Sequence, residues 1–114
     1  MDQYSTGLDT VFAALADPTR RAVLGRLGLG PASIGALAAP FDMALPSFMK
    51  HVRFLEGSGL IRTAKHGRVR TCMLERQRLA VVEGWLAEQR AIWEARADRL
   101  EAFVLEERKR ERNP

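Results

Sequence analysis

The segment from residue 44 to residue 70 constrains the fold more than any other part of the chain. It begins with a short amphipathic helical pattern, LPSFMKHVRFLE, followed by a glycine break and then by two strand-like runs. The segment has a single acidic residue, Glu56, against six basic residues, which are Lys50, Arg53, Arg62, Lys65, Arg68 and Arg70. Six positive charges and one negative charge give +5, whereas the whole chain carries only +4. A concentrated basic patch beside a helix that fits the major groove indicates double-stranded DNA as the partner.

Helical patterns dominate the part of the chain before this segment. A first amphipathic helix is predicted from apolar residues spaced at i, i+3, i+4 and i+7, which are Leu8, Val11, Phe12 and Leu15. Asp17 and Pro18 are typical of an N-cap and a first helical position, and they predict a second helix. We expect this second helix to bury Ala22, Val23 and Leu27. Ser33 predicts the start of a short third helix that ends near Pro40.

The pattern changes after the fourth helix, which we expect over residues 45–56. Residues 61–64 and 69–74 are strand-like, and residues 65–68 would join them through a turn in which Gly67 supplies a positive φ. A last helix is predicted over about residues 77–110. The chain is thus predicted to be one domain, residues 1–114, with its core at about 8–75. The fold class is mainly α, with four helices, a two-stranded hairpin and a last helix, which is the order of a winged helix-turn-helix.

Composition excludes several classes of function. The chain has 114 residues, 46% hydrophobic and 28% charged, as in a soluble globular domain. The N-terminus does not resemble a signal peptide and no apolar run is long enough to span a bilayer, so we expect a cytoplasmic protein without membrane contact. One cysteine and two histidines predict no metal site and no cofactor, and no set of residues suggests an enzyme. Cys72 is expected to be a small buried hydrophobic residue.

Three motifs carry a resemblance to a known family. Residues 12–24, FAALADPTRRAVL, resemble the opening of ArsR-type winged-helix repressors, and residues 50–61, KHVRFLEGSGLI, are similar to that family's recognition region. The sequence His66-Gly67-Arg68 resembles its wing tip, and the resemblance covers roughly residues 8–105. Ala44 departs from the pattern, because the family usually places a serine there. The cysteine cluster and the histidines of the metal-sensing members are absent, so the resemblance implies a branch that does not sense metal.

This resemblance implies that the helix over residues 45–56 enters the major groove with its N-terminal end toward the bases. The predicted DNA-binding residues lie on that helix and on the hairpin: Ser47, Met49, Lys50, His51, Arg53, Lys65, Arg68 and Arg70. Lys50 can donate to guanine O6 and N7, and Met49 can offer an apolar contact to a thymine methyl group. We expect Arg68 to reach the DNA backbone or an adjacent minor groove. Arg20 and Arg21 are further candidates for phosphate contacts.

The last helix carries a wide apolar stripe in which Leu86, Trp93 and Leu100 recur every seven residues. A terminal helix with such a stripe needs a partner to cover it. The resemblance implies that it pairs with the first helix and with a second copy of the chain to form a homodimer, which would read an inverted repeat. The predicted dimer interface comprises Leu8, Val11, Phe12, Val82, Trp85, Leu86, Ile92, Trp93 and Leu100.

The sequence therefore predicts a sequence-specific DNA-binding transcriptional regulator, most simply a repressor. A different class also fits: a winged-helix protein-interaction module that uses the basic patch to bind an acidic protein. Within the first class, a constitutive repressor and one controlled by a small-molecule effector both fit. An effector would occupy a cavity between the first and last helices lined by Trp85, Ile92 or Trp93.

Overall fold

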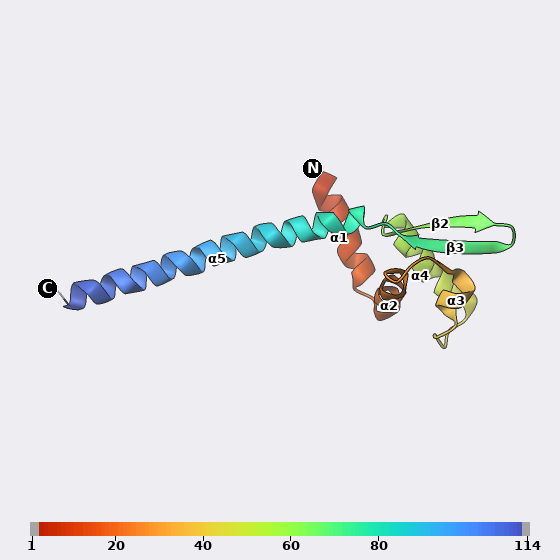
Figure 1. Cartoon of the computed structure of the whole chain (residues 1–114), viewed down its shortest axis with the longest axis horizontal. Coiled ribbons are helices and arrows are strands. Elements are labelled where there is room, and N and C mark those ends of the chain that lie inside the picture. The colour runs from red at the N-terminus through yellow and green to blue at the C-terminus, as the bar shows by residue number, and fades with distance from the viewer. Residues whose placement is uncertain (1–2, 113–114) are drawn as a thin grey trace. The chain divides into compact units, whose positions relative to one another are not determined.

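The computed structural model describes residues 3–112, and it confirms the predicted order of helices and strands with one additional short strand (Figure 1). The elements are α1 (Gln3–Leu15), α2 (Pro18–Leu27), β1 (Ala32–Ser33), α3 (Ile34–Ala38), α4 (Leu45–Gly57), β2 (Ile61–His66), β3 (Val69–Leu74) and α5 (Gln77–Arg112). The chain divides into two compact units after Val82. The first unit holds α1 to β3 and the first turns of α5, and the second unit is the remainder of α5.

The predicted capping residues begin two of the helices. The Asp17 side chain accepts a hydrogen bond from the backbone N–H of Arg20 at 2.9 Å, and Pro18 follows as the first residue of α2. The Ser33 hydroxyl accepts from the backbone N–H of Ala36 at 3.1 Å and begins α3. These bonds satisfy N–H groups that have no partner within the helix, and the side chains therefore fix where each helix starts.

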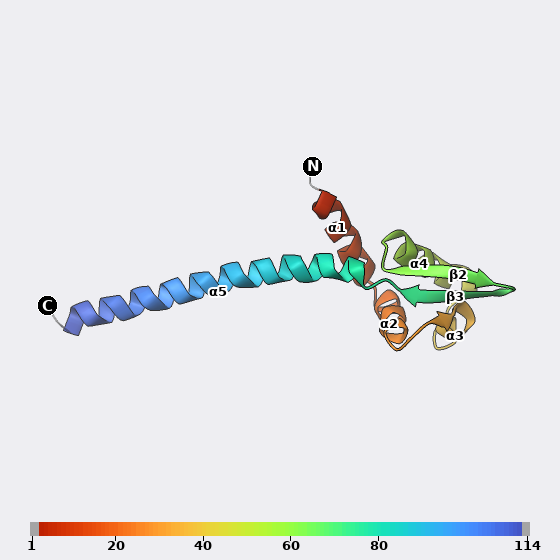
Figure 2. The same cartoon turned by 45° about the horizontal axis from the view of Figure 1, so that its top comes forward.

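The three strands form an antiparallel sheet in the order β1-β3-β2. The hairpin between β2 and β3 is tighter than predicted, because Lys65 pairs with Arg70 and His66 pairs with Val69. The turn is therefore Gly67 and Arg68 alone, and Gly67 has the expected positive φ of 62°. The strand β1 was not predicted, since a two-residue strand is too short to show a periodicity. The hairpin extends beyond the helices of the first unit (Figure 2).

The core of the first unit lies between the helices and the sheet. Its fully buried side chains include Phe48 and Leu55 of α4, Val23 of α2 and Cys72 of β3. The burial of Cys72 confirms the expectation for that residue. The prediction that Ala22 is buried was wrong, because Val23 and Leu27 form the inward face of α2 and successive helical residues point in different directions. Among the described residues no helix is both long and apolar enough to cross a membrane.

Candidate nucleic-acid interface

The helix α4 divides its side chains between the core and the surface. Its buried face consists of Phe48, Val52 and Leu55. Ser47, Lys50 and Arg53 are exposed, as the prediction requires, whereas Met49 and His51 are half-buried. Ser47, Lys50 and His51 occupy positions i, i+3 and i+4 and therefore lie on one side of the helix, whereas Met49 lies on another side, so the expected common face does not include Met49.

His51 faces α2 and is held there by two side chains. Its Nδ1 atom lies 3.2 Å from Nη1 of Arg20 and 3.6 Å from Oδ2 of Asp17. The Arg20 guanidinium also stacks on the ring of Phe54, with Cζ 4.3 Å from the ring centroid. The hydrogen bond from the Arg20 backbone N–H holds the pKa of the Asp17 carboxyl below its ordinary value, and the charge of the Arg20 guanidinium acts in the same direction. The start of α2 is thereby tied to the middle of α4.

Arg20 also joins these helices to α1. Its Nε donates to the carbonyl of Ala14 at 2.9 Å and its Nη2 donates to the carbonyl of Ala13 at 2.8 Å. Arg21 donates to the carbonyl of Leu15 at 2.7 Å. Both arginines therefore donate to carbonyl groups in the last turn of α1, where few backbone donors remain. Both guanidinium groups are thus engaged within the chain, and the phosphate contacts that the sequence suggested for these arginines stay a prediction.

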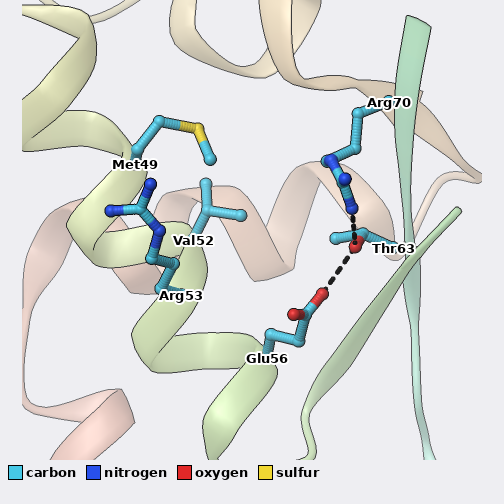
Figure 3. Close-up of a pocket in the computed structure, with 6 residues that line it drawn as sticks. All are labelled: Met49, Val52, Arg53, Glu56, Thr63 and Arg70. Carbon is cyan, nitrogen blue, oxygen red and sulfur yellow. Dashed lines mark hydrogen bonds between the residues drawn. The ribbon is translucent and has the colours of Figure 1, made fainter. Parts of the chain in front are cut away.

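A groove separates α4 from the hairpin (Figure 3). It is lined by Met49, Val52, Arg53, Glu56, Thr63 and Arg70. Within the hairpin, Nη1 of Arg70 donates to the Thr63 hydroxyl at 2.9 Å, and across the groove that hydroxyl donates to Oε2 of Glu56 at 2.6 Å. The guanidinium of Arg70 is thus turned toward α4, and the chain of bonds ties the hairpin to the helix.

The basic patch is consequently smaller than the sequence suggested. Arg62 forms an ion pair with Glu75, with 2.7 Å between Nε and Oε1, and Arg70 is bonded to Thr63 of the neighbouring strand. The exposed basic side chains that remain on this surface lie on α4 and on the hairpin tip, and they are Lys50, Arg53, Lys65 and Arg68. We call these four residues the basic surface. Two separate elements contribute to it, which suits a partner that presents both a groove and a backbone.

The N-terminal end of α4 contains a residue that the sequence analysis did not select. Ala44 occupies the N-cap position and forms no side-chain hydrogen bond to the helix. Leu45 follows as the first helical residue and its exposed fraction is 56%. Leu45 precedes the first buried residue, Phe48, by three positions, which places the two on the same side of the helix, so the helical pattern alone gave no sign that Leu45 is exposed.

Comparison with known proteins settles the family. A model described as a helix-turn-helix domain matches residues 15–64. The solved structure of an ArsR family transcriptional regulator, RHA00566, is 65% identical, covers 82% of this chain and 97% of that one, and superposes with a TM-score of 0.78. The HTH-type transcriptional regulator Rv2034 of Mycobacterium tuberculosis is 34% identical over 65% of this chain and 69% of its own. The chain belongs to the ArsR family of transcriptional regulators. The transcriptional repressor SdpR of Bacillus subtilis is 33% identical over 54% of this chain and 68% of its own.

Two residues expected at the dimer interface of this ArsR-family protein belong instead to the core of the single chain. Val11 has no exposed surface and Val82 is buried, so neither has surface left for a second copy to cover. Leu8 is half-buried and packs against the same core. The other predicted interface residues are exposed, and they are Phe12, Trp85, Leu86, Ile92, Trp93 and Leu100.

Residues 3–112 contain no cluster of three or more histidine, cysteine, aspartate or glutamate side chains that could hold a metal ion. Burial raises the pKa of the Cys72 thiol, and the nearby carboxylate of Glu56 acts in the same direction. A thiol in this state is a poor metal ligand and a poor nucleophile.

Proposed function

We propose that this ArsR-family regulator is a homodimeric, cytoplasmic repressor that binds an inverted-repeat operator and does not sense metal. The observation that carries the proposal is the basic surface, in which α4 and the hairpin tip present exposed cations from one rigid unit. The helix would enter the major groove and the hairpin tip would follow the flanking backbone. Occupancy of the operator would then exclude the polymerase. The similarity to a transcriptional repressor supports this direction of control.

The exposed residues of α4 would divide the contacts with DNA. Ser47 and Lys50 lie in its N-terminal half and would bond to base edges, with Lys50 donating to guanine. Arg53 lies one turn further along and would meet a phosphate. Lys65 and Arg68 of the hairpin would add phosphate contacts, which carry affinity but little sequence information.

The other three predicted DNA-binding residues would act from behind this surface. His51 is in contact with Arg20, Met49 packs against the core, and Arg70 is bonded to Thr63. In these positions they would hold α4 and the hairpin at the angle that the DNA requires. We therefore propose direct contacts for the exposed residues and a positioning role for these three.

The proposal of a homodimer is supported by the exposed apolar residues of α5. Trp93 is 60% exposed and Leu100 is 64% exposed, seven residues apart on one face of the helix. Large apolar side chains at this spacing are typical of helix pairing. A dimer would also double the number of base pairs read, which a single small module needs for specificity.

The dimer can be tested by sedimentation or light scattering at micromolar concentration. The unaltered protein is expected to have twice the mass of one chain, and Trp93→Glu is expected to shift it to the mass of one chain. The matched control is Leu29→Glu, since Leu29 is an exposed leucine in the loop after α2. A single-chain mass for the unaltered protein would contradict the proposal.

The DNA contacts can be tested on a duplex selected from random sequences with the purified protein. Lys50→Ala is expected to lower affinity for the selected duplex by about 1–3 kcal/mol and to relax preference at one base position in each half-site. Arg68→Ala is expected to weaken binding to all duplexes by a similar factor and to reduce the slope of log affinity against log salt by about 1 per half-site. Lys109→Ala, in the last turn of α5, serves as a basic control. If Arg68→Ala instead changes which sequence is preferred, this division of roles is wrong.

A further inference from the structure

Leu45 is a large apolar side chain at the end of α4 that the proposed function directs toward the bases. Two large hydrophobic residues of α4 are counted as exposed, Leu45 at 56% and Phe54 at 41%. Phe54 lies near the other end of the helix and is covered on one side by the Arg20 guanidinium. Leu45 is therefore the large hydrophobic side chain exposed at the N-terminal end of α4, where Pro46 beside it is smaller.

The hydrophobic core of the first unit does not include Leu45. Leu45 also does not belong to the half-buried residues packed against that core, although Met49 does. Leu45 and Met49 occupy positions i and i+4, on the same row of the helix. Because Met49 packs against the core, Leu45 is the residue of this row that can make an apolar contact with a base pair.

The chemistry of the major groove restricts what Leu45 can recognise. A leucine side chain has no hydrogen-bonding atom, and the apolar group that a base pair offers in this groove is the C5-methyl of thymine. We infer that Leu45 reads the methyl group of one thymine in each half-site of the operator. This inference rests on the proposed function, since it requires α4 to lie in the major groove.

The size of the effect follows from the apolar area of one methyl group that is removed from solvent. Burial of one such group changes an equilibrium constant by about fourfold. Because a homodimer would make the contact in both half-sites, removal of both methyl groups is expected to weaken binding by about sixteenfold.

Uracil provides the test, because it differs from thymine only by the missing methyl group and keeps every hydrogen-bonding atom. The thymines of the selected duplex are replaced by uracil one position at a time, at the equivalent position of both half-sites, and the affinity of the full-length protein is measured for each duplex. At one symmetric position the affinity of the unaltered protein for the duplex is expected to fall about sixteenfold when uracil replaces thymine. Leu45→Ala is expected to bind the thymine and uracil duplexes within about twofold of each other at that position. Leu29→Ala, which truncates an exposed leucine outside α4, is expected to keep the full difference.

Three results would overturn the inference. The first is a preferred duplex to which the unaltered protein binds equally with thymine or uracil at every position. The second is a methyl effect that persists in Leu45→Ala. The third is a methyl effect that is lost in a folded Met49→Ala and kept in Leu45→Ala, which would assign the contact to Met49. The absence of any preferred duplex is a different outcome, because it would overturn the proposed function together with this inference.

Discussion

Replacement of Arg20 by alanine should destabilise the protein far more than an exposed arginine normally would. Its guanidinium donates to the carbonyls of Ala13 and Ala14, contacts the ring nitrogen of His51 and stacks on Phe54. One side chain thus connects the end of α1, the start of α2 and the middle of α4. Loss of these contacts removes the Arg20 donor from the Ala14 carbonyl at the end of α1, whereas the Ala13 carbonyl keeps the backbone N–H of Ala16.

The magnitude can be estimated contact by contact. A hydrogen bond that involves a charged group contributes about 1.5–3 kcal/mol when it is shielded from solvent, so the part-buried bond to Ala14 contributes about 1.5 kcal/mol and the exposed bond to Ala13 about 1 kcal/mol. A partly exposed cation–π contact adds about 0.5 kcal/mol. The free energy of unfolding should therefore fall by about 3 kcal/mol. With a urea dependence of about 1.5 kcal/mol per molar, the midpoint of urea unfolding should fall by about 2 M.

The assay is urea unfolding followed by circular dichroism at one fixed protein concentration, because the stability of a dimer depends on concentration. Arg21→Ala is the matched control: Arg21 is the next residue, it is exposed, and it donates one bond to the carbonyl of Leu15. The free energy of unfolding of this control variant should fall by at most about 1 kcal/mol. Arg20→Lys keeps the charge but lacks the planar fork, and it should recover only part of the loss. Equal losses in Arg20→Ala and Arg21→Ala would refute the reasoning.

Three further predictions concern single positions. Gly59→Ala should lower the free energy of unfolding by about 1–2 kcal/mol, because Gly59 has φ 78° and an added Cβ would lie 2.7 Å from Nε of Arg78. In the same unfolding assay the control Gly57→Ala should cause no loss, because a Cβ added there meets no atom within 4 Å. The Asp17 carboxyl has a lowered pKa in the folded state, so its contribution to stability is present above its ordinary pKa and is lost as the pH falls through the folded value. Asp17→Asn retains an N-cap and should therefore flatten the pH dependence of stability below about pH 4. An unchanged pH profile in this variant would contradict the prediction. The Cys72 thiol is buried with a raised pKa, so a thiol reagent such as dithionitrobenzoate should modify it in urea and hardly at all in the native protein.

Local sequence signals were sufficient to predict most of the fold. The caps at Asp17 and Ser33 act within three residues of themselves, and Gly67 is required by its own backbone conformation, so each could be read without knowledge of the tertiary structure. The strand β1 has only two residues and is defined by its pairing with β3, nearly 40 positions later. Elements that depend on such distant pairing leave little local signal.

The same distinction applies to the candidate site. The motifs locate α4 and the hairpin, but they do not tell which side chains on α4 remain exposed. His51 is held by Arg20, which lies 31 positions earlier, and Arg70 is turned toward Glu56 through Thr63. Leu45 was missed for the opposite reason, because apolar residues on an amphipathic helix are ordinarily assigned to the core. Only the packing of the neighbouring elements separates these cases.

The most direct test of the central claim is a fluorescence-anisotropy titration of the purified protein against the selected duplex and a shuffled duplex at two salt concentrations. A sequence-specific regulator is expected to prefer the selected duplex by about 10³-fold or more and to lose affinity for both duplexes as salt rises. Equal, salt-sensitive affinities for the two duplexes would contradict the account. That result would leave the basic surface as a site for an acidic protein, the other class of partner that fits its charge.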